Sequence, residues 1–248
     1  MNVVLHGKPP SYLTYPGLMA LGLPHATTTR HCPGIQSGSA AASPFAPSAR
    51  DALAPAGLDL SRVTWAKQVH GADVARAPAA AGLAGRADVL VTAERGAPVA
   101  IFTADCLPLT AYDPEARVLG VAHVGWRGLV RGTVPASVTA LTSIGARLDC
   151  LGVAIGPAIG PCCYEIDTPV IEQFAAAHAS QWQRWVAPAR PGHWMLDLWA
   201  AAEDLLEHAG IPRERIENPR LCTACHPELL YSYRKGNRGR LVTLAALP

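Results

Sequence analysis

The sequence predicts an α/β fold in which a mixed β-sheet is flanked by helices. Strand-like and helical runs alternate along the chain, and several strand-like neighbours are joined by turns too short for a parallel crossover. No linker or internal repeat divides the 248 residues, and half of them are hydrophobic, which is enough for a sizeable core. We therefore expect a single domain over residues 1–248.

The expected strands are short apolar runs rich in β-branched residues. The best-defined pair lies at 107–125, where the turn YDPEAR joins two such runs. Pro114 suits position i+1 of that turn because its φ is already fixed near the required value. Further strands are expected at 62–71, 72–78, 87–96, 97–105, 148–160 and 238–247.

The N-terminal quarter gives weaker signals. Residues 1–30 fit an edge strand and loops, and 31–50, rich in small residues and Pro, fit a loop or a poorly ordered stretch. A helix is expected at 49–58, weakened by Pro55.

Helices are expected in the second half of the chain. Apolar side chains recur at helical spacing over 126–146, which predicts one helix there. A second is predicted over 167–179, with Pro169 in its first turn. The clearest lies at 195–210 and ends with Gly210 just past its last turn.

Composition limits the function classes. The net charge is only +2 without a long charge run, so nucleic-acid binding has little electrostatic support. No run of 18 apolar residues predicts a membrane span, and the N-terminus is a poor signal peptide. Seven cysteines are an odd number, and a chain of this length does not need disulfide bonds for stability. We therefore expect reduced thiols and a cytoplasmic location.

Three strand-like runs end in residues suited to metal binding: His70, Cys106 and His123. Rigid folds place chemistry at strand ends, and Cys and His suit Zn²⁺ or copper. Three protein ligands leave a fourth position open, as in catalytic zinc sites. The ligands are 36 and 17 residues apart, so spacing alone leaves open a buried core cysteine and two hydrogen-bonded histidines.

Other cysteines offer a rival site. The motif CTACH supplies Cys222, Cys225 and His226, a tighter metal or redox signature, but no second C-x-x-C completes it. Cys162 and Cys163 are adjacent, and neighbours on a strand face opposite sides, so packing is the expected role for both. The chain has neither a G-x-G-x-x-G motif nor a P-loop.

Several long motifs resemble the YfiH-like family, also called laccase-domain or multicopper polyphenol oxidase-like proteins. They run in the family's order over residues 63–248 and comprise WAKQVHG, FTADCLPL, GVAHVGWRGLVRGTV, AIGPAIGPCCYEI, LDLWAAAEDLL, CTAC and YSYRKGNRGRL. Residues 1–62 diverge: Arg30 matches the family's Arg, but the family's double glycine and later Asn are absent.

The resemblance implies a mixed-sheet α/β sandwich and a zinc ion held by His70, Cys106 and His123. It also implies a purine nucleoside phosphorylase acting on adenosine, inosine or methylthioadenosine, and an adenosine deaminase. Such a protein binds a small nucleoside and phosphate, with neither a nucleic acid nor a membrane as partner, and is a monomer or homodimer.

Catalysis would need acid–base and phosphate-binding groups near the metal. Asp105 is the acid–base candidate, and Arg30 and then Arg127 are candidates to clamp phosphate, because an Arg fork binds its oxygens bidentately. The substrate-contacting candidates, each with a packing or orienting alternative, are Gln68, Tyr164 and Glu165.

Three alternatives stay open at this point. One is a copper-dependent polyphenol oxidase, although a laccase needs several copper ions and the motifs offer one three-ligand site. Another is editing of peptidoglycan precursors, a role also suggested for the family. The third is a non-catalytic binding module stabilised by zinc.

Overall fold

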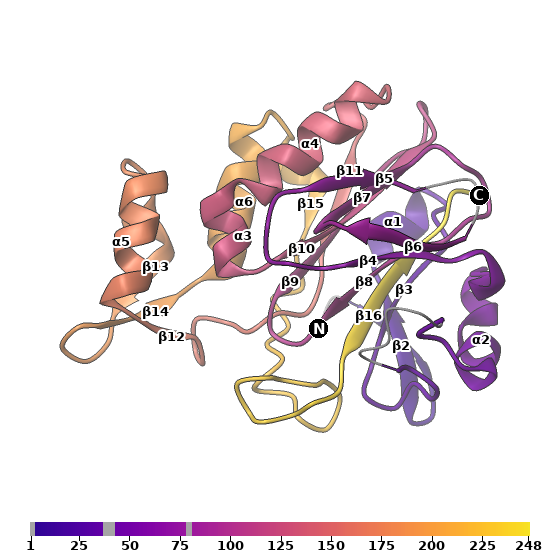
Figure 1. Cartoon of the computed structure of the whole chain (residues 1–248), viewed down its shortest axis with the longest axis horizontal. Coiled ribbons are helices and arrows are strands. Elements are labelled where there is room, and N and C mark those ends of the chain that lie inside the picture. Colours follow the sequence, from indigo (N-terminus) through magenta and orange to yellow (C-terminus); the bar gives the residue numbers. More distant parts are fainter. Residues whose placement is uncertain (1–2, 37–42, 78–80) are drawn as a thin grey trace.

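Two β-sheets stack at the centre of the fold, and helices lie on their outer faces (Figure 1). The computed structural model describes residues 3–36, 43–77 and 81–248. The larger sheet has seven strands, in the order β1 (Val4–Gly7), β2 (Pro10–Thr14), β3 (His25–Thr28), β16 (Leu241–Ala245), β8 (Val99–Thr103), β4 (Thr64–Lys67) and β6 (Gly82–Arg86).

The second sheet has six strands and carries most of the candidate site. Its order is β15 (Ile216–Glu217), β11 (Gly152–Ile155), β9 (Leu107–Asp113), β10 (Val118–Val124), β7 (Val89–Thr92) and β5 (Val74–Arg76). Strands β9 and β10 are antiparallel, whereas β5 and β7 are parallel, so the sheet is mixed as predicted. A small third sheet has the order β12 (Glu165–Asp167), β14 (His193–Leu196) and β13 (Val186–Pro188).

Helices cover both outer faces of the stacked sheets. On the six-stranded sheet lie α3 (Trp126–Arg131), α4 (Thr133–Ser143) and α6 (Leu198–His208), and on the seven-stranded sheet lies α2 (Pro47–Leu53). The short α1 (Pro16–Ala20) follows β2, and α5 (Thr168–Ala177) stands beside the small sheet, away from the centre of Figure 1. No helix in the described part of the chain is long and apolar enough to cross a membrane.

Strand β10 shows how the sequence builds these layers. Its side chains alternate between faces, as a strand requires. Val118, Ala122 and Val124 pack toward the helices, whereas Leu119 and Val121 pack between the two sheets. Every residue of β10 is buried, so the strand is covered on both faces.

The predicted helix over 126–146 is wrong as a single element. The chain breaks at Gly132, whose φ of 84° lies in the left-handed region that ends one helix and turns into the next. The helical spacing of Val134, Val138 and Leu141 belongs to α4 alone, where these residues are buried.

The remaining differences lie where local signals were weak. Strand β6 has the sequence GLAGR, with two glycines and no apolar alternation, and the small sheet consists of strands of three or four residues. The helix expected at 49–58 is shorter and gives way at Leu53 to a 3-10 turn containing Pro55. The loop expected at 31–50 includes 37–42, which lie outside the described residues.

Candidate metal centre and its pocket

His70, Cys106 and His123 converge at one end of the six-stranded sheet. One ligand atom from each lies within 4.8 Å of the other two, and the Cys106 Sγ is 3.7 Å from His70 Nε2. Around a tetrahedral zinc ion, a sulfur and an imidazole nitrogen are about 3.6 Å apart, given usual bond lengths. The three side chains predicted from the sequence thus meet at the spacing one ion requires.

Strand pairing sets two of these positions. Cys106 lies immediately before β9, and His123 lies in β10 opposite Pro108, so the antiparallel register places both at one strand end. His70 comes from the turn after β4, with a φ of 56°, a conformation that few non-glycine residues adopt. Gly125 completes the fit, because an added Cβ there would lie 2.9 Å from the Cys106 Sγ.

Asp88 supports two of the ligands from behind. It is fully buried directly before β7, and Ala122 pairs with Val89, so its carboxylate faces the His123 ring. His123 Nδ1 donates to Asp88 Oδ1 across 2.8 Å, and the backbone N–H of His70 donates to the same oxygen across 3.0 Å. The N–H groups of Val69 and Gly71 also donate to this carboxylate.

This pattern is the usual outer shell of a metal-bound imidazole. A carboxylate that accepts the Nδ1 proton fixes the ring and leaves Nε2 for the metal. Burial raises the pKa of Asp88, but the hydrogen bonds from His123 and the backbone outweigh it and keep the pKa below its usual value. Asp88 therefore stays ionised and acts only as an acceptor.

The electrostatics of the centre favour a thiolate. Burial alone would raise the pKa of Cys106, but His123 first and His70 second lower it to about 6. Burial likewise opposes a charge on His123, yet Asp88 and Cys106 raise its pKa to about 9. A thiolate, two imidazoles and an outer carboxylate form a donor set that fits Zn²⁺.

The three ligands open onto a pocket of about 880 Å³, large enough for a small-molecule ligand. Its wall includes the aromatic residues Trp65, Phe102, Trp126, Tyr164 and Tyr233. The basic residues of the wall are Lys67, Arg127, Arg234 and Arg240. Asp105 is the one carboxylate among the described lining residues, so the pocket suits an anionic ligand with a flat ring.

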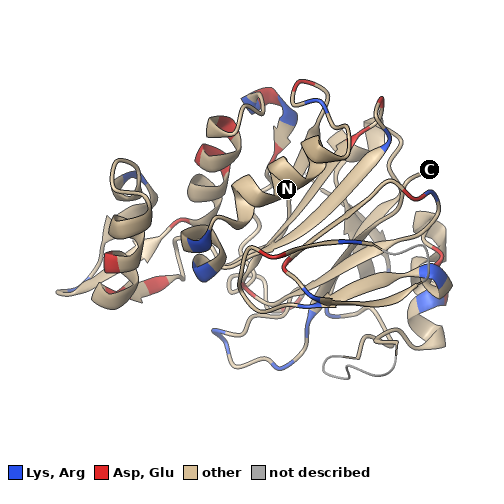
Figure 2. Cartoon of the chain, turned by 45° about the horizontal axis from the view of Figure 1, so that its top comes forward, with Lys and Arg blue, Asp and Glu red and all other residues tan. Residues whose placement is uncertain are grey.

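The basic residues of the pocket wall are part of a local cluster of positive charge, and the protein surface as a whole is not basic. Figure 2 shows Lys and Arg mixed with Asp and Glu over most of the elements, with a basic run on the loop before β16. That loop contains Arg234, Lys235, Arg238 and Arg240. The charge is thus concentrated beside the pocket.

Asp105 and Gln68 line the pocket, but both side chains are engaged by the protein. Asp105 Oδ1 accepts a hydrogen bond from the Thr223 hydroxyl across 2.5 Å, and Oδ2 accepts one from the backbone N–H of Arg234 across 2.7 Å. The Gln68 amide both donates to and accepts from the backbone of Phe102, each across 2.7 Å. These contacts give the two residues a positioning role in the structure.

The other predicted site residues divide between the pocket and its surroundings. Arg127 and Tyr164 line the pocket, and the Arg127 guanidinium stacks on Trp126, 4.3 Å from the ring centroid. Glu165 lies in an adjoining depression and pairs with Arg190 across 2.8 Å. Arg30 is not brought to the pocket: its guanidinium donates to the Pro227 carbonyl and lies over the Tyr231 ring.

Sequence reasoning missed Asp88 and assigned no role to Arg234. The Asp88 carboxylate precedes an apolar strand-like run, as Cys106 does, and that shared position is the signal that could have singled it out. Arg234 lies in the motif YSYRKG, and its guanidinium stacks on Tyr164 and donates to the Glu165 carbonyl across 3.1 Å.

The fold and site together define an α/β protein with stacked mixed sheets and a candidate His–Cys–His metal centre in a basic, aromatic pocket. The chain belongs to the family described as multi-copper polyphenol oxidoreductase laccase, whose model matches residues 46–248. This match confirms the resemblance that the motifs indicated over residues 63–248. It also extends further toward the N-terminus, to residue 46.

Relatives and solved structures agree with this assignment. A protein of Deinococcus radiodurans named purine nucleoside phosphorylase is 35% identical over 95% of this chain and 96% of its own length. One of Xylella fastidiosa with the same name is 36% identical over 73% of this chain and 70% of its own length. YfiH of Bacillus licheniformis superposes with a TM-score of 0.87 at 26% identity, and YlmD of Geobacillus stearothermophilus with 0.84 at 27%, each over 99% of both chains. The predicted sandwich fold is confirmed.

Proposed function

We propose that this protein is a zinc-dependent purine nucleoside phosphorylase that cleaves adenosine, inosine or methylthioadenosine. The products are the free base and ribose-1-phosphate or methylthioribose-1-phosphate. The observation that carries the proposal is one pocket that combines a His–Cys–His centre with basic and aromatic walls. The names of the relatives support the broader class, a purine nucleoside phosphorylase.

Phosphate would bind the basic wall. Arg127 projects from the first residues of α3 beside the metal ligands, and its planar fork matches two phosphate oxygens. Arg234 and Arg240 add positive charge to the same wall. Arg30, the first candidate from the sequence, contacts the protein backbone elsewhere, so Arg127 becomes the preferred clamp.

The purine would stack on the aromatic wall. Trp126 and Tyr164 offer flat faces, and aromatic stacking tolerates either an amino or an oxo group on the base. Burial, and then the nearby Cys106 thiolate, raise the pKa of Tyr164. Its phenol therefore stays protonated at neutral pH and can donate a hydrogen bond to the departing base.

The reaction balances with hydrogenphosphate as the only co-substrate. One phosphate oxygen forms a bond to C1′ of the ribose, and the electron pair of the C1′–N bond leaves with the purine. The proton carried by hydrogenphosphate ends on the purine nitrogen. Arg127 orients the nucleophile, and the aromatic wall holds the leaving group.

His70, Cys106 and His123 would hold the zinc ion, and Asp88 would orient His123. When bound, Zn²⁺ supplies Lewis-acid polarisation and an activated water. That second property makes adenosine deamination at the same pocket a further activity of this proposal, with inosine and ammonia as products. Asp88 anchors the backbone of His70, and Thr223 together with the backbone N–H of Arg234 holds Asp105 beside Cys106.

A copper-dependent phenol oxidase is the competing assignment, prompted by the family's description. Two imidazoles and a thiolate also suit a single copper ion, usually with a weak axial Met. The described lining residues include no Met, and the described metal-capable groups contain two histidines in total. Several copper ions would need more imidazoles than these groups provide.

A cytoplasmic location is part of the proposal. All seven cysteines are free thiols in the structure, as expected for a protein kept in a reducing compartment.

The test is an assay of the zinc-loaded protein with each nucleoside, with and without phosphate. Base and ribose-1-phosphate formed only with phosphate support phosphorolysis, and inosine with ammonia supports deamination. His123→Ala should abolish both activities, while Cys150→Ser, remote from the centre, serves as the matched control. Turnover of a phenol by the copper-loaded protein, with no nucleoside turnover by the zinc form, would overturn the proposal.

A further inference from the structure

A second group of thiols lies outside the pocket. Cys162, Cys163, Cys222 and Cys225 place their sulfur atoms within 4.8 Å of one another. The Cys225 Sγ is 3.4 Å from that of Cys162 and 3.5 Å from that of Cys163. We propose that these four cysteines bind a structural zinc ion.

The sulfur spacing fits a shared metal rather than disulfide bonds. A disulfide joins two sulfurs at about 2.0 Å. Four thiolates around one tetrahedral zinc ion have sulfurs about 3.8 Å apart, from Zn–S bonds of about 2.3 Å. The observed distances are much closer to the second value, and four ligands would close the coordination shell as structural zinc sites do.

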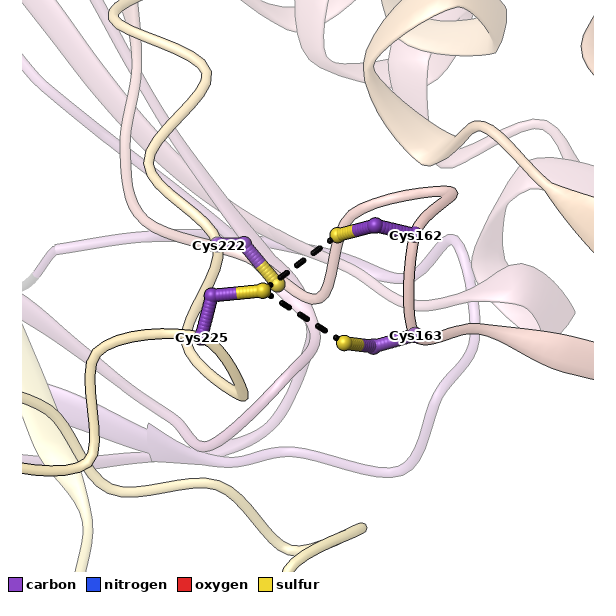
Figure 3. A group of neighbouring side chains, drawn as sticks. All are labelled: Cys162, Cys163, Cys222 and Cys225. Carbon is purple, nitrogen blue, oxygen red and sulfur yellow. Dashed lines mark hydrogen bonds between the residues drawn. The ribbon is translucent and has the colours of Figure 1, made fainter.

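The backbone removes the reason for expecting that Cys162 and Cys163 only pack. Both lie in a turn, in which the N–H groups of Cys163 and Tyr164 donate to the Gly160 carbonyl across 2.9 and 3.0 Å. The alternation of a strand does not apply to a turn, so the two neighbours can face the same point. Figure 3 shows them side by side, with Cys222 and Cys225 opposite.

The C-x-x-C segment supplies the other half of the site. Its turn closes with the Cys225 N–H donating to the Cys222 carbonyl across 3.3 Å. The Gly160 N–H donates to the Cys222 Sγ across 3.2 Å, a contact that stabilises a metal-bound thiolate. His226, the third expected ligand, stays outside this group and lies 3.3 Å from a Glu228 oxygen.

The solvent exposure of these cysteines argues against a role as apolar core residues alone. Cys162 and Cys225 are exposed, and Cys163 is partly so, whereas a cysteine acting as a core hydrophobe is normally buried. Without a metal, the exposed thiols of Cys162 and Cys225 would be open to oxidation. Binding zinc releases their protons to solvent and leaves four thiolates committed to the metal.

The zinc would join two loops that form the back of the pocket. The first runs from Gly160 to Tyr164, and Tyr164 lines the pocket. In the second, Thr223, between the two cysteines, donates its hydroxyl to Asp105, the neighbour of the ligand Cys106. By joining these two loops, the cluster zinc would hold the wall behind the His–Cys–His centre. It would take no part in the reaction.

Zinc stoichiometry in single variants separates the two sites. After reconstitution under reducing conditions, elemental analysis and native mass spectrometry should find two zinc ions per wild-type chain. Cys106→Ser should retain one ion, held by the cysteine cluster, and Cys225→Ser should retain one at the pocket. Cys150→Ser is the matched control and should retain two.

Cobalt gives a readout that does not need activity. The Co²⁺ form of Cys106→Ser should show strong thiolate-to-cobalt absorption from the cluster, and Cys162→Ser in that background should lose it. Removing the cluster zinc should also lower the melting temperature by about 5 °C or more, as expected when a tight ligand is lost.

Three results would overturn this inference. One is a Cys106→Ser protein that binds no zinc. All four cluster cysteines are intact in this variant, so the result could not be blamed on misfolding of a cluster variant. Another is a zinc content that is the same in Cys225→Ser as in the wild-type chain. The third is peptide mapping that finds Cys225 in a disulfide with Cys162 or Cys163 in freshly purified protein.

Discussion

Asp88 accepts the Nδ1 proton of His123 across 2.8 Å, with both side chains buried. Because an ionised carboxylate can only accept, the contact keeps a proton on Nδ1 and turns Nε2 toward the centre. The same carboxylate binds the backbone of His70, so one residue positions two of the three ligands. The arrangement of the three side chains therefore depends on a carboxylate that is not one of them.

Asp88→Asn should weaken zinc binding at the pocket by about 10- to 100-fold, as loss of an outer-shell carboxylate usually does. An amide keeps the size of the side chain but no longer provides a negative charge for His123. The measurement is chelator competition for the pocket zinc, made in a Cys225→Ser background so that one site is titrated.

Asp113→Asn is the matched control for that experiment. Asp113 is equally buried and accepts backbone N–H groups from Glu115, Ala116 and Arg147, but it lies at the opposite end of β9 from Cys106. Both variants should lose about 1–3 kcal/mol of folding stability. Equal zinc affinity in the two would contradict the role of Asp88.

The thiol of Cys106 should be reactive in mildly acidic solution when metal is absent. Its pKa of about 6 lies below the usual value of 9.0, so the thiolate exists above pH 6 and is lost as the pH falls through 6. The same depression stabilises the metal-free fold above the unfolded thiol pKa, and that contribution disappears as the pH falls through about 6. Alkylation of the Cys106 peptide, followed by mass spectrometry, should therefore show a midpoint near pH 6.

Two comparisons test the cause of that reactivity. In His123→Gln the midpoint should move above the usual thiol value, because burial then acts with less opposition. Cys32, whose pKa burial raises to about 11, should stay unmodified up to pH 9 in the same protein. A Cys106 midpoint unchanged by His123→Gln would show that the imidazole does not set the thiol pKa.

The sequence predicts those parts of the centre that depend on local patterns and misses those that depend on long-range strand pairing. His70, Cys106 and His123 each end an apolar run, which made them candidates, but it was the family motifs that joined them into one predicted site. The position of Asp88 before an apolar run is a local signal, but its contact with His123 arises from the long-range pairing of Ala122 with Val89, which the sequence pattern does not reveal. The cysteine cluster was missed because Cys162 and Cys163 were judged by the alternation of a strand, whereas they lie in a turn.

The fold shows the same division. Strands with continuous apolar runs, such as β9 and β10, are predictable because burial on both faces demands them. Strand β6 is held by pairing with β4 rather than by its own residues, so nothing in GLAGR indicates it. The break at Gly132 was missed because a single glycine within a helical pattern is often tolerated.

Gly125→Ala should impair the metal centre by steric pressure alone. The backbone at Gly125 has a φ of −89°, which alanine adopts freely, but the new Cβ would lie 2.9 Å from the Cys106 Sγ and 3.2 Å from His70 Cδ2. Zinc affinity should fall by tenfold or more while the far-ultraviolet circular dichroism stays unchanged. Gly71→Ala, also beside His70, meets its neighbours at 3.5 Å or more and should bind zinc normally. Equal zinc affinity in the two variants would show that the centre tolerates displacement of its ligands.

Arg127→Gln should raise the KM for phosphate by about 10- to 100-fold in the phosphorolysis assay, because charge-assisted hydrogen bonds to a phosphate contribute roughly 1.5–3 kcal/mol. Arg127→Lys should recover only part of this loss, since an ammonium keeps the charge but not the planar fork. Arg30→Gln should leave the phosphate KM unchanged, because that guanidinium is bound to the Pro227 carbonyl and lies over Tyr231. Steady-state kinetics at saturating nucleoside, with phosphate varied, gives all three values. A KM raised by Arg30→Gln and unaffected by Arg127→Gln would return the phosphate clamp to Arg30, and would mean that the N-terminal loop moves toward the pocket when substrate binds.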